Sequence, residues 1–234
     1  MATRRIIKDK DFGQIVIGTR RTARNITMRV RPDGLHVTVP PYSKTEKVMA
    51  TLETFRERLL EQYRKVEIRP IDFSYAIRTA CFRLWLEPSP LKCFTLKQTG
   101  EGICICCPAD VDFSCEQVQK LVRAAILRAL KKSAGSYLLP LLEALAERYG
   151  FSYRKVKITG ARSRWGSCSA AGTISLSCYL ILLPPHLMDY VLLHELSHTK
   201  EMNHSPRFWE LLDSLTEGKA LSLRAELRNY RPAF

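Results

Sequence analysis

Histidine is scarce in this sequence, and long apolar runs are absent from it. Only five of the 234 residues are histidines, so any cluster of them carries information. No apolar run approaches the roughly 20 residues that a membrane-spanning helix needs, and we expect no membrane partner. The N-terminus lacks the hydrophobic core of a secretory signal, which predicts a cytoplasmic protein.

Acidic residues are missing from two long stretches, residues 12–32 and 148–188. The first stretch contains five arginines, and the whole chain carries a net charge of +14 at pH 7. Basic patches of this kind attract nucleic acid, anionic lipid or acidic polypeptide. The simpler interpretation is a solvated basic surface, so we expect at most weak nucleic-acid binding. The five arginines are Arg20, Arg21, Arg24, Arg29 and Arg31.

Cysteine is plentiful, with eight residues, but their arrangement does not suggest a disulfide framework. Cys104 and Cys106 alternate on a predicted strand, and Cys107 follows directly. In a cytoplasmic protein we expect reduced cysteines that act mostly as small hydrophobic residues.

A weak internal repeat organises the N-terminal half. Residues 26–40 align without gaps on residues 94–108, and each copy reads as strand, glycine-containing turn, strand and proline. A capping-box pattern follows each proline, at Ser43–Glu46 and Ser114–Gln117, and predicts helices over 44–65 and 115–133. Residues 1–135 are therefore expected to form two β-hairpin–helix units, a possible binding platform, unless the repeat is a coincidence of common hairpins.

The C-terminal part, residues 136–234, has a different pattern. A helix is predicted over 137–149 with Gly150 as its C-cap, followed by strands at 153–159 and 173–177. Another helix should begin after Pro185 and run to about Glu201, and Ser205 should cap a last one. The expected fold class is α+β.

The motif that carries the most information about function is His194-Glu-Leu-Ser-His198, followed by His204. A helix places residues i and i+4 on one face, so His194 and His198 can reach one metal ion. His204 can supply a third ligand and leave one position open, as in catalytic zinc sites. Glu195, beside the first ligand, can act as a base on water without binding the metal. The motif predicts bound Zn²⁺, with Glu201 as the alternative third ligand.

Other candidates for binding substrate or an oxyanion are less well defined by the sequence. Arg164, Tyr179, Tyr190 and Tyr230 have side chains that could donate to an oxyanion. An edge strand near the metal could pair with an extended peptide, and residues 165–169 or 173–177 are the candidates. Within the first of these, Trp165 could equally belong to the core, and Gly166 indicates close backbone approach.

Three motifs together resemble the YgjP-like metallopeptidase family. They are Arg164-Trp-Gly-Ser-Cys-Ser169, Asp189-Tyr-Val-x-x-His-Glu-Leu-x-His198 and Asn203-His-Ser-x-x-Phe-Trp209. The resemblance is specific over about residues 153–215 and weaker before them. It implies a zincin-like core, similar to that of SprT-like and Wss1-like proteases, with His194, His198 and His204 as ligands and Glu195 as base.

The predicted function is a zinc-dependent metallohydrolase that acts on a peptide or protein substrate. Two alternatives stay open at this point. One is a nucleic-acid-associated protein, or a protease that acts on nucleic-acid-bound protein, through the basic N-terminal region. The other is hydrolysis of a non-peptide amide.

Overall fold

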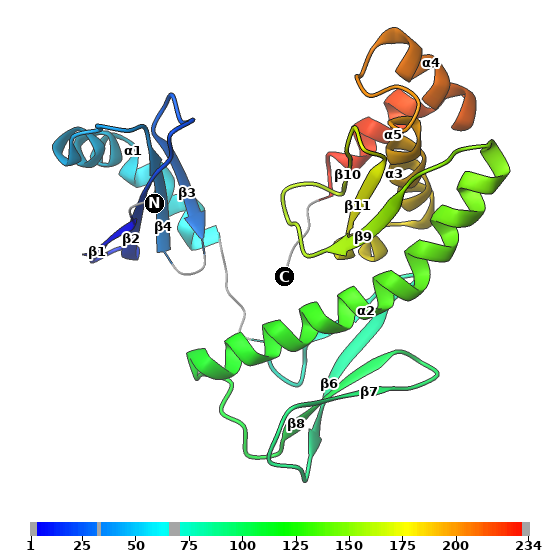
Figure 1. Ribbon diagram of the computed structural model, residues 1–234. Helices are drawn as coiled ribbons and strands as arrows, with labels where there is room; N and C mark the ends of the chain where they lie inside the picture. The colour runs from blue at the N-terminus through cyan, green and yellow to red at the C-terminus, as the bar shows by residue number, and fades with distance from the viewer. Residues whose placement is uncertain (1–3, 32–33, 66–70, 231–234) are drawn as a thin grey trace. The chain divides into compact units, whose positions relative to one another are not determined.

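The computed structural model describes residues 4–31, 34–65 and 71–230 and has a mixed α/β fold. The chain divides into two compact units, residues 1–69 and 70–234 (Figure 1). This division differs from the boundary expected near residue 135. Among the described residues, no helix is both long and apolar enough to cross a membrane.

The first unit is a four-stranded sheet followed by one helix. The strand order is β1-β2-β4-β3, with antiparallel pairs at both edges and a parallel pair, β2 and β4, in the centre. Alternate residues of β2 and β4 face helix α1 and form a small apolar core that includes Phe12, Ile15, Leu35 and Leu52. The elements are β1 (Arg4–Asp9), β2 (Gly13–Thr19), β3 (Thr27–Arg31), β4 (Gly34–Val39) and α1 (Thr45–Lys65).

The second unit begins with a sheet of the same topology. Its order is β5-β6-β8-β7, again with antiparallel edge pairs and a parallel central pair, β6 and β8. The repeat therefore covers four strands and the start of a helix, and not only the single hairpin that the sequence alignment detected. The strands are β5 (Ala76–Arg78), β6 (Arg83–Ser89), β7 (Thr95–Gln98) and β8 (Ile103–Pro108).

Two glycines at matching repeat positions explain part of the sequence similarity. Gly34 is the first residue of β4 and Gly102 directly precedes β8, with φ angles of +126° and +155°. A Cβ atom at either residue would collide with the backbone carbonyl of the parallel neighbour, Gln14 or Arg83. Both sheets thus need glycine where the two central strands start. Pro32 and Asp33, predicted for the first turn, lie outside the described residues.

The cysteines of β8 lie on both faces of its strand. Cys107 is buried in the main core with Ile103 and Ile105, whereas Cys104 and Cys106 point to the opposite face with their sulfurs 3.9 Å apart. All eight cysteines are free thiols. Burial raises the pKa of Cys104 to about 12 and that of Cys107 to about 11, so both thiols stay protonated.

A single helix, α2 (Glu116–Tyr149), replaces the two predicted helices over 115–133 and 137–149. Every fourth side chain faces the core without interruption: Ile126, Leu130, Ala134, Leu138, Leu142 and Ala146. This stripe runs through residues 134–136, where a break between the two helices was expected, and past Pro140. Burying each leucine stabilises the helix by about 1.5–3 kcal/mol, enough to offset a proline that costs about 3 kcal/mol.

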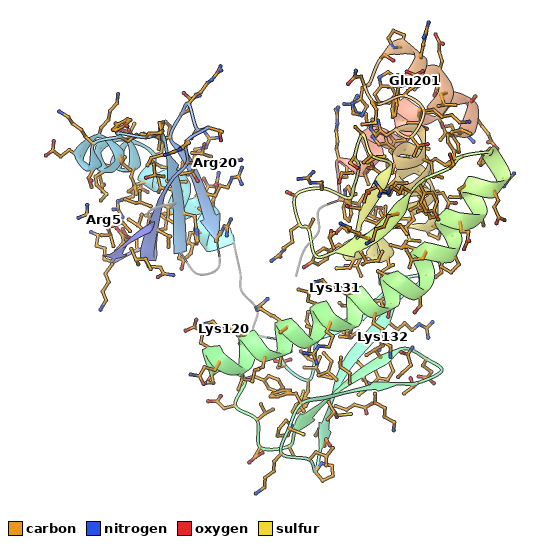
Figure 2. All side chains as sticks on the ribbon, in the orientation of Figure 1. Arg5, Arg20, Lys120, Lys131, Lys132 and Glu201 are labelled. Atoms are coloured by element: carbon orange, nitrogen blue, oxygen red, sulfur yellow. The ribbon has the colours of Figure 1, made fainter. Side chains whose placement is uncertain are left out.

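The ends of α2 follow one prediction and contradict another. Gly150 is the C-cap in a left-handed conformation, as expected. At the other end the N-cap is Cys115, without a side-chain cap, and the predicted capping residue Ser114 donates its hydroxyl to Asp112 instead. Exposed lysines, including Lys120, Lys131 and Lys132, mark the solvent side of the helix (Figure 2).

Of the remaining elements, β9, η1 and α3 pack against α2. A three-stranded sheet has the order β10-β11-β9, so β10 is an edge strand and β11 is central. Because a central strand has neighbours on both sides, only β10 of the two predicted candidates is open to pairing. The elements are β9 (Lys155–Thr159), β10 (Gly166–Cys168), β11 (Thr173–Ser177), the 3₁₀-helix η1 (Cys178–Leu182), α3 (Pro185–Ser197), α4 (Pro206–Leu215) and α5 (Ala220–Leu227).

One continuous core joins the second repeat copy to these elements, which is why the compact unit begins near residue 70. Helix α2 supplies the connection, because it contacts β8 of the repeat copy and also β9, η1 and α3 (Figure 1).

Candidate metal centre

Helix α3 presents the first two histidines from a buried position. Leu192, Leu193 and Leu196 are buried around them, so the helix cannot rotate without exposing apolar surface. The helix ends at Ser197, four residues earlier than predicted, and His198 is its C-cap. The chain turns there because Thr199 and Lys200 donate to carbonyls three residues back.

The turn brings the third histidine back toward the other two. His204 lies just before α4, whose N-cap Ser205 accepts a hydrogen bond from the amide of Phe208. Pro206 occupies the first helical position, as the sequence predicted. The cap fixes the backbone at Ser205 and so restricts the position of the adjacent His204 Cα and Cβ atoms.

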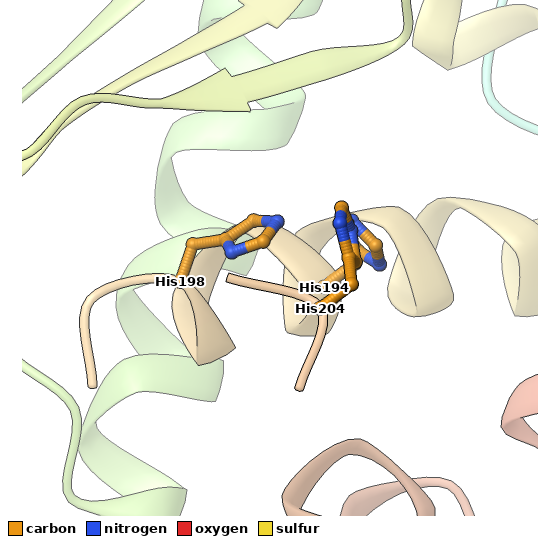
Figure 3. A group of neighbouring side chains, drawn as sticks. All are labelled: His194, His198 and His204. Atoms are coloured by element: carbon orange, nitrogen blue, oxygen red, sulfur yellow. The ribbon is translucent and has the colours of Figure 1, made fainter. Parts of the chain in front are cut away.

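The three imidazoles converge on one point (Figure 3). One nitrogen from each of His194, His198 and His204 lies within 4.8 Å of the others. The Nε2 atoms of His194 and His204 are 3.2 Å apart. Two nitrogens bound tetrahedrally to zinc at about 2.0–2.1 Å would be about 3.3–3.4 Å apart, so this spacing fits a shared ion.

Phe208 forms a floor under the cluster. Its ring is fully buried and lies 5.0, 4.5 and 4.8 Å, centroid to centroid, from the rings of His194, His198 and His204. Trp209 stacks on the outer side of His204 at 5.8 Å. The sequence indicated these two aromatics only as packing residues. Their position four and five residues after the third histidine, about one helical turn, would have been the signal that they border the site.

The protonation of the histidines suits a cation. Burial, followed by the neighbouring His198 and His204, lowers the pKa of His194 to about 3. Burial also lowers the pKa of His198, whose Nδ1 donates to the carbonyl of Glu201 at 3.1 Å. That hydrogen bond leaves Nε2 of His198 as its available ligand atom. Neutral imidazoles with free lone pairs are the form that binds metal.

Glu195 is the buried acid of the site. It is 5% exposed, and its Oε2 has no hydrogen-bond partner among the described residues, a state shared by Nδ1 of His194. Burial raises the pKa of Glu195 to about 8, and the charge of Arg164 opposes the shift. Buried polar atoms without partners are uncommon and often mark functional sites. Glu195 can therefore hold or release a proton near neutral pH.

Gly166 makes room for that carboxyl group. A Cβ atom on Gly166 would lie 2.5 Å from Oε1 of Glu195. The sequence predicted that the backbone at Gly166 comes close to another group. That group is the carboxyl of Glu195 on α3, which edge strand β10 approaches at Gly166.

The other predicted residues differ in their distance from the histidines. Tyr190 is buried beside the cluster, its ring 6.0 Å from that of His194. Tyr179 is 2% exposed and belongs to the main core, with Arg162 over its ring. Trp165 is half-buried and packs against that core while lining a surface cavity.

The acid proposed as an alternative ligand lies outside the metal-binding group. The group of possible ligands among the described residues contains the three histidines and not Glu201. Glu201 contributes its backbone carbonyl to His198 instead.

The chain is similar to one family model and to a solved metallopeptidase structure. The model of the YgjP-like metallopeptidase domain matches residues 24–230. Among solved structures, the chain is similar to the metallopeptidase zymogen of abylysin from Pyrococcus abyssi, with 27% identity, a TM-score of 0.35, and coverage of 38% of this chain and 90% of that one. No curated protein matches the chain. Because the family model spans most of the sequence, the chain belongs to the YgjP-like metallopeptidase family.

Proposed function

We propose that the protein is a zinc-dependent peptidase in which His194, His198 and His204 hold the metal and Glu195 is the general base. The observation that carries the proposal is the convergence of three imidazoles beside a buried carboxyl group whose Oε2 has no hydrogen-bond partner among the described residues. Three nitrogen ligands leave one position of a tetrahedral ion open, which distinguishes a catalytic site from a structural one.

The chemistry that zinc would supply here is Lewis-acid activation of water and of the scissile carbonyl. Glu195 would accept the proton of the attacking water and return it to the leaving amine. Its pKa, raised by burial, suits both transfers better than that of an exposed glutamate.

Edge strand β10 is the proposed binding site for the substrate backbone. Its free edge can pair with an extended peptide, and Gly166 on that strand lies against Glu195. Main-chain pairing of this kind would bring a peptide bond toward the metal with little dependence on sequence. Arg164 and Tyr190 are the candidates for stabilising the oxyanion, since the charge of Arg164 acts on Glu195 and the ring of Tyr190 lies 6.0 Å from that of His194.

A proteome-derived peptide library tests the proposal. The zinc-loaded wild type is expected to cleave some of its peptides. Glu195→Gln should keep zinc and fold and lose about 10²–10⁴-fold in rate, because only the proton acceptor is removed. Glu201→Gln is the matched control, an acid close in sequence with no assigned role, and should cleave like the wild type. Undiminished cleavage by zinc-loaded Glu195→Gln would contradict the mechanism.

A further inference from the structure

A cavity rich in arginine lies next to the metal centre. Its volume is about 460 Å³, and none of the described residues that line it is acidic. Four guanidinium groups and two aromatic rings dominate its walls: Arg162, Arg164, Arg224, Arg228, Trp165 and Tyr230. The arginines come from the loop before β10 and from the end of α5, two segments far apart in sequence.

Two walls of this cavity continue into the catalytic site. On one side, Arg164 lies two residues before Gly166, which packs against Glu195, and the charge of Arg164 acts on that acid. On the other side, the guanidinium of Arg224 lies over the ring of Trp209 at 5.0 Å, and Trp209 stacks on His204. A ligand group in the cavity would therefore lie beside the metal.

Three of the four arginines carry a charge that the ion pairs between described residues leave available to a ligand. None of the ion pairs between described residues involves Arg164, Arg224 or Arg228. The one acid on α5, Glu226, pairs with His186 at 2.8 Å. Guanidinium groups gathered in one concave site repel each other, and each presents a planar fork that matches a carboxylate.

We propose that this arginine pocket binds a carboxylate of the peptide substrate, either an acidic side chain or a free C-terminal carboxylate, close to the scissile bond. The proposal rests on the proposed peptidase function and names its substrate class. An extended peptide advances about 3.3 Å per residue, so the carboxylate belongs to a residue a few positions from the cleaved bond.

Paired peptides that differ by one charge test this specificity. A cleaved peptide is remade with Glu or Gln at each of three positions on either side of the bond, and with a free or an amidated C-terminus. One acidic form should be cleaved at least about tenfold better than its neutral partner, as expected for a lost charge-assisted hydrogen bond. The position of that effect distinguishes the side chain from the terminus. Equal cleavage of all acid and neutral pairs would overturn the proposal.

Variants of the pocket sharpen the test. Arg228→Gln should raise KM for the acidic peptide about tenfold, leave kcat within about twofold, and leave the neutral peptide unaffected. Arg128→Gln, an exposed arginine of α2 outside the pocket, is the matched control and should change neither. An equal loss for acidic and neutral peptides in Arg228→Gln would overturn the proposal.

A binding measurement separates this proposal from the peptidase assignment. Zinc-loaded Glu195→Gln is titrated with the acidic and neutral peptides, and tryptophan fluorescence is followed because Trp165 lines the pocket. Tighter binding of the acidic peptide, abolished by Arg228→Gln, supports the pocket even if no peptide is cleaved by the wild type. Equal binding of both peptides contradicts the pocket even if cleavage is observed.

Discussion

The two copies of the repeat have the same sheet topology but different relations to the rest of the chain. The first copy closes its own core with α1, a helix of 21 residues, and forms a compact unit by itself. The second copy shares α2, a helix of 34 residues, with the elements that carry the histidines. The two copies therefore differ in the length of the helix that covers the sheet. The copy with the short helix has a core of its own, and the copy with the long helix shares its core with the elements that carry the histidines.

The largest expected effect comes from replacing one fully buried leucine in each of the two cores by alanine. Leu130→Ala on α2 and Leu52→Ala on α1 each remove a fully buried side chain and should destabilise their unit by about 2–5 kcal/mol. Leu130→Ala should also weaken zinc binding, since its core continues to α3, whereas Leu52→Ala should not. Segment-resolved hydrogen exchange and chelator competition measure both effects. Equal zinc loss in the two variants would refute the separation of the cores.

The paired glycines give the next largest effect. Gly34→Ala and Gly102→Ala should each cost about 2–4 kcal/mol, from a positive φ and a collision with a backbone carbonyl. Gly100→Ala, with no atom within 4 Å of the added carbon, is the control in the same hairpin as Gly102. Urea unfolding of the three variants provides the comparison. A Gly102→Ala protein as stable as Gly100→Ala would show that the shared strand register does not require glycine.

A smaller effect concerns acid sensitivity of the first copy. Hydrogen bonds from Arg56 lower the pKa of Asp9 from 3.8 to about 2. Asp9 therefore stabilises the unit fully above pH 4, and this contribution is lost as the pH falls toward 2. Asp9→Asn should lower the free energy of unfolding at neutral pH by about 1–3 kcal/mol. It should also reduce the decrease of that free energy between pH 4 and pH 2. A variant in which this decrease is unchanged would exclude Asp9 as the group responsible.

The convergence of the three histidines could be predicted from the sequence because it is local. His194, Glu195, His198 and His204 lie within eleven residues, so helical spacing and one cap bring them together. The arginine pocket could not be predicted, because Arg164 and Arg224 meet only through the packing of α5 near the loop before β10. Gly166 was recognised as a close approach, but its partner Glu195 comes from another element.

The fold shows the same contrast between local and distant signals. The hairpins at 26–40 and 94–108 were visible through their turns, whereas their parallel pairing with β2 and β6 depends on contacts between strands that the alignment did not relate. Helix α2 was predicted as two helices, over 115–133 and 137–149, because the two apolar stripes were identified separately. The buried positions at every fourth residue, Leu130 through Leu142, were present in the sequence.

The smallest expected effect is polyanion binding by the first copy. Arg29 and Arg31 are exposed on edge strand β3, while Met28 and Val30 between them are half-buried. We predict weak DNA or RNA binding without sequence preference, because charge is present but no element that reads bases is apparent. Affinity should fall steeply with salt, and the slope should flatten when Arg20, Arg21 and Arg24 are changed to Ser. Titration of the protein with DNA or RNA at two ionic strengths tests this prediction. Absence of binding at low salt would mean that the arginines only form a solvated basic surface.

The most direct test of the account is the amount of zinc bound per chain. The wild type is expected to hold about one zinc ion, as three convergent imidazoles require. His186→Ala, which removes a histidine paired with Glu226 outside the cluster, should hold the same amount. His204→Ala should lose most of the metal. Full zinc occupancy in His204→Ala would contradict the three-histidine site.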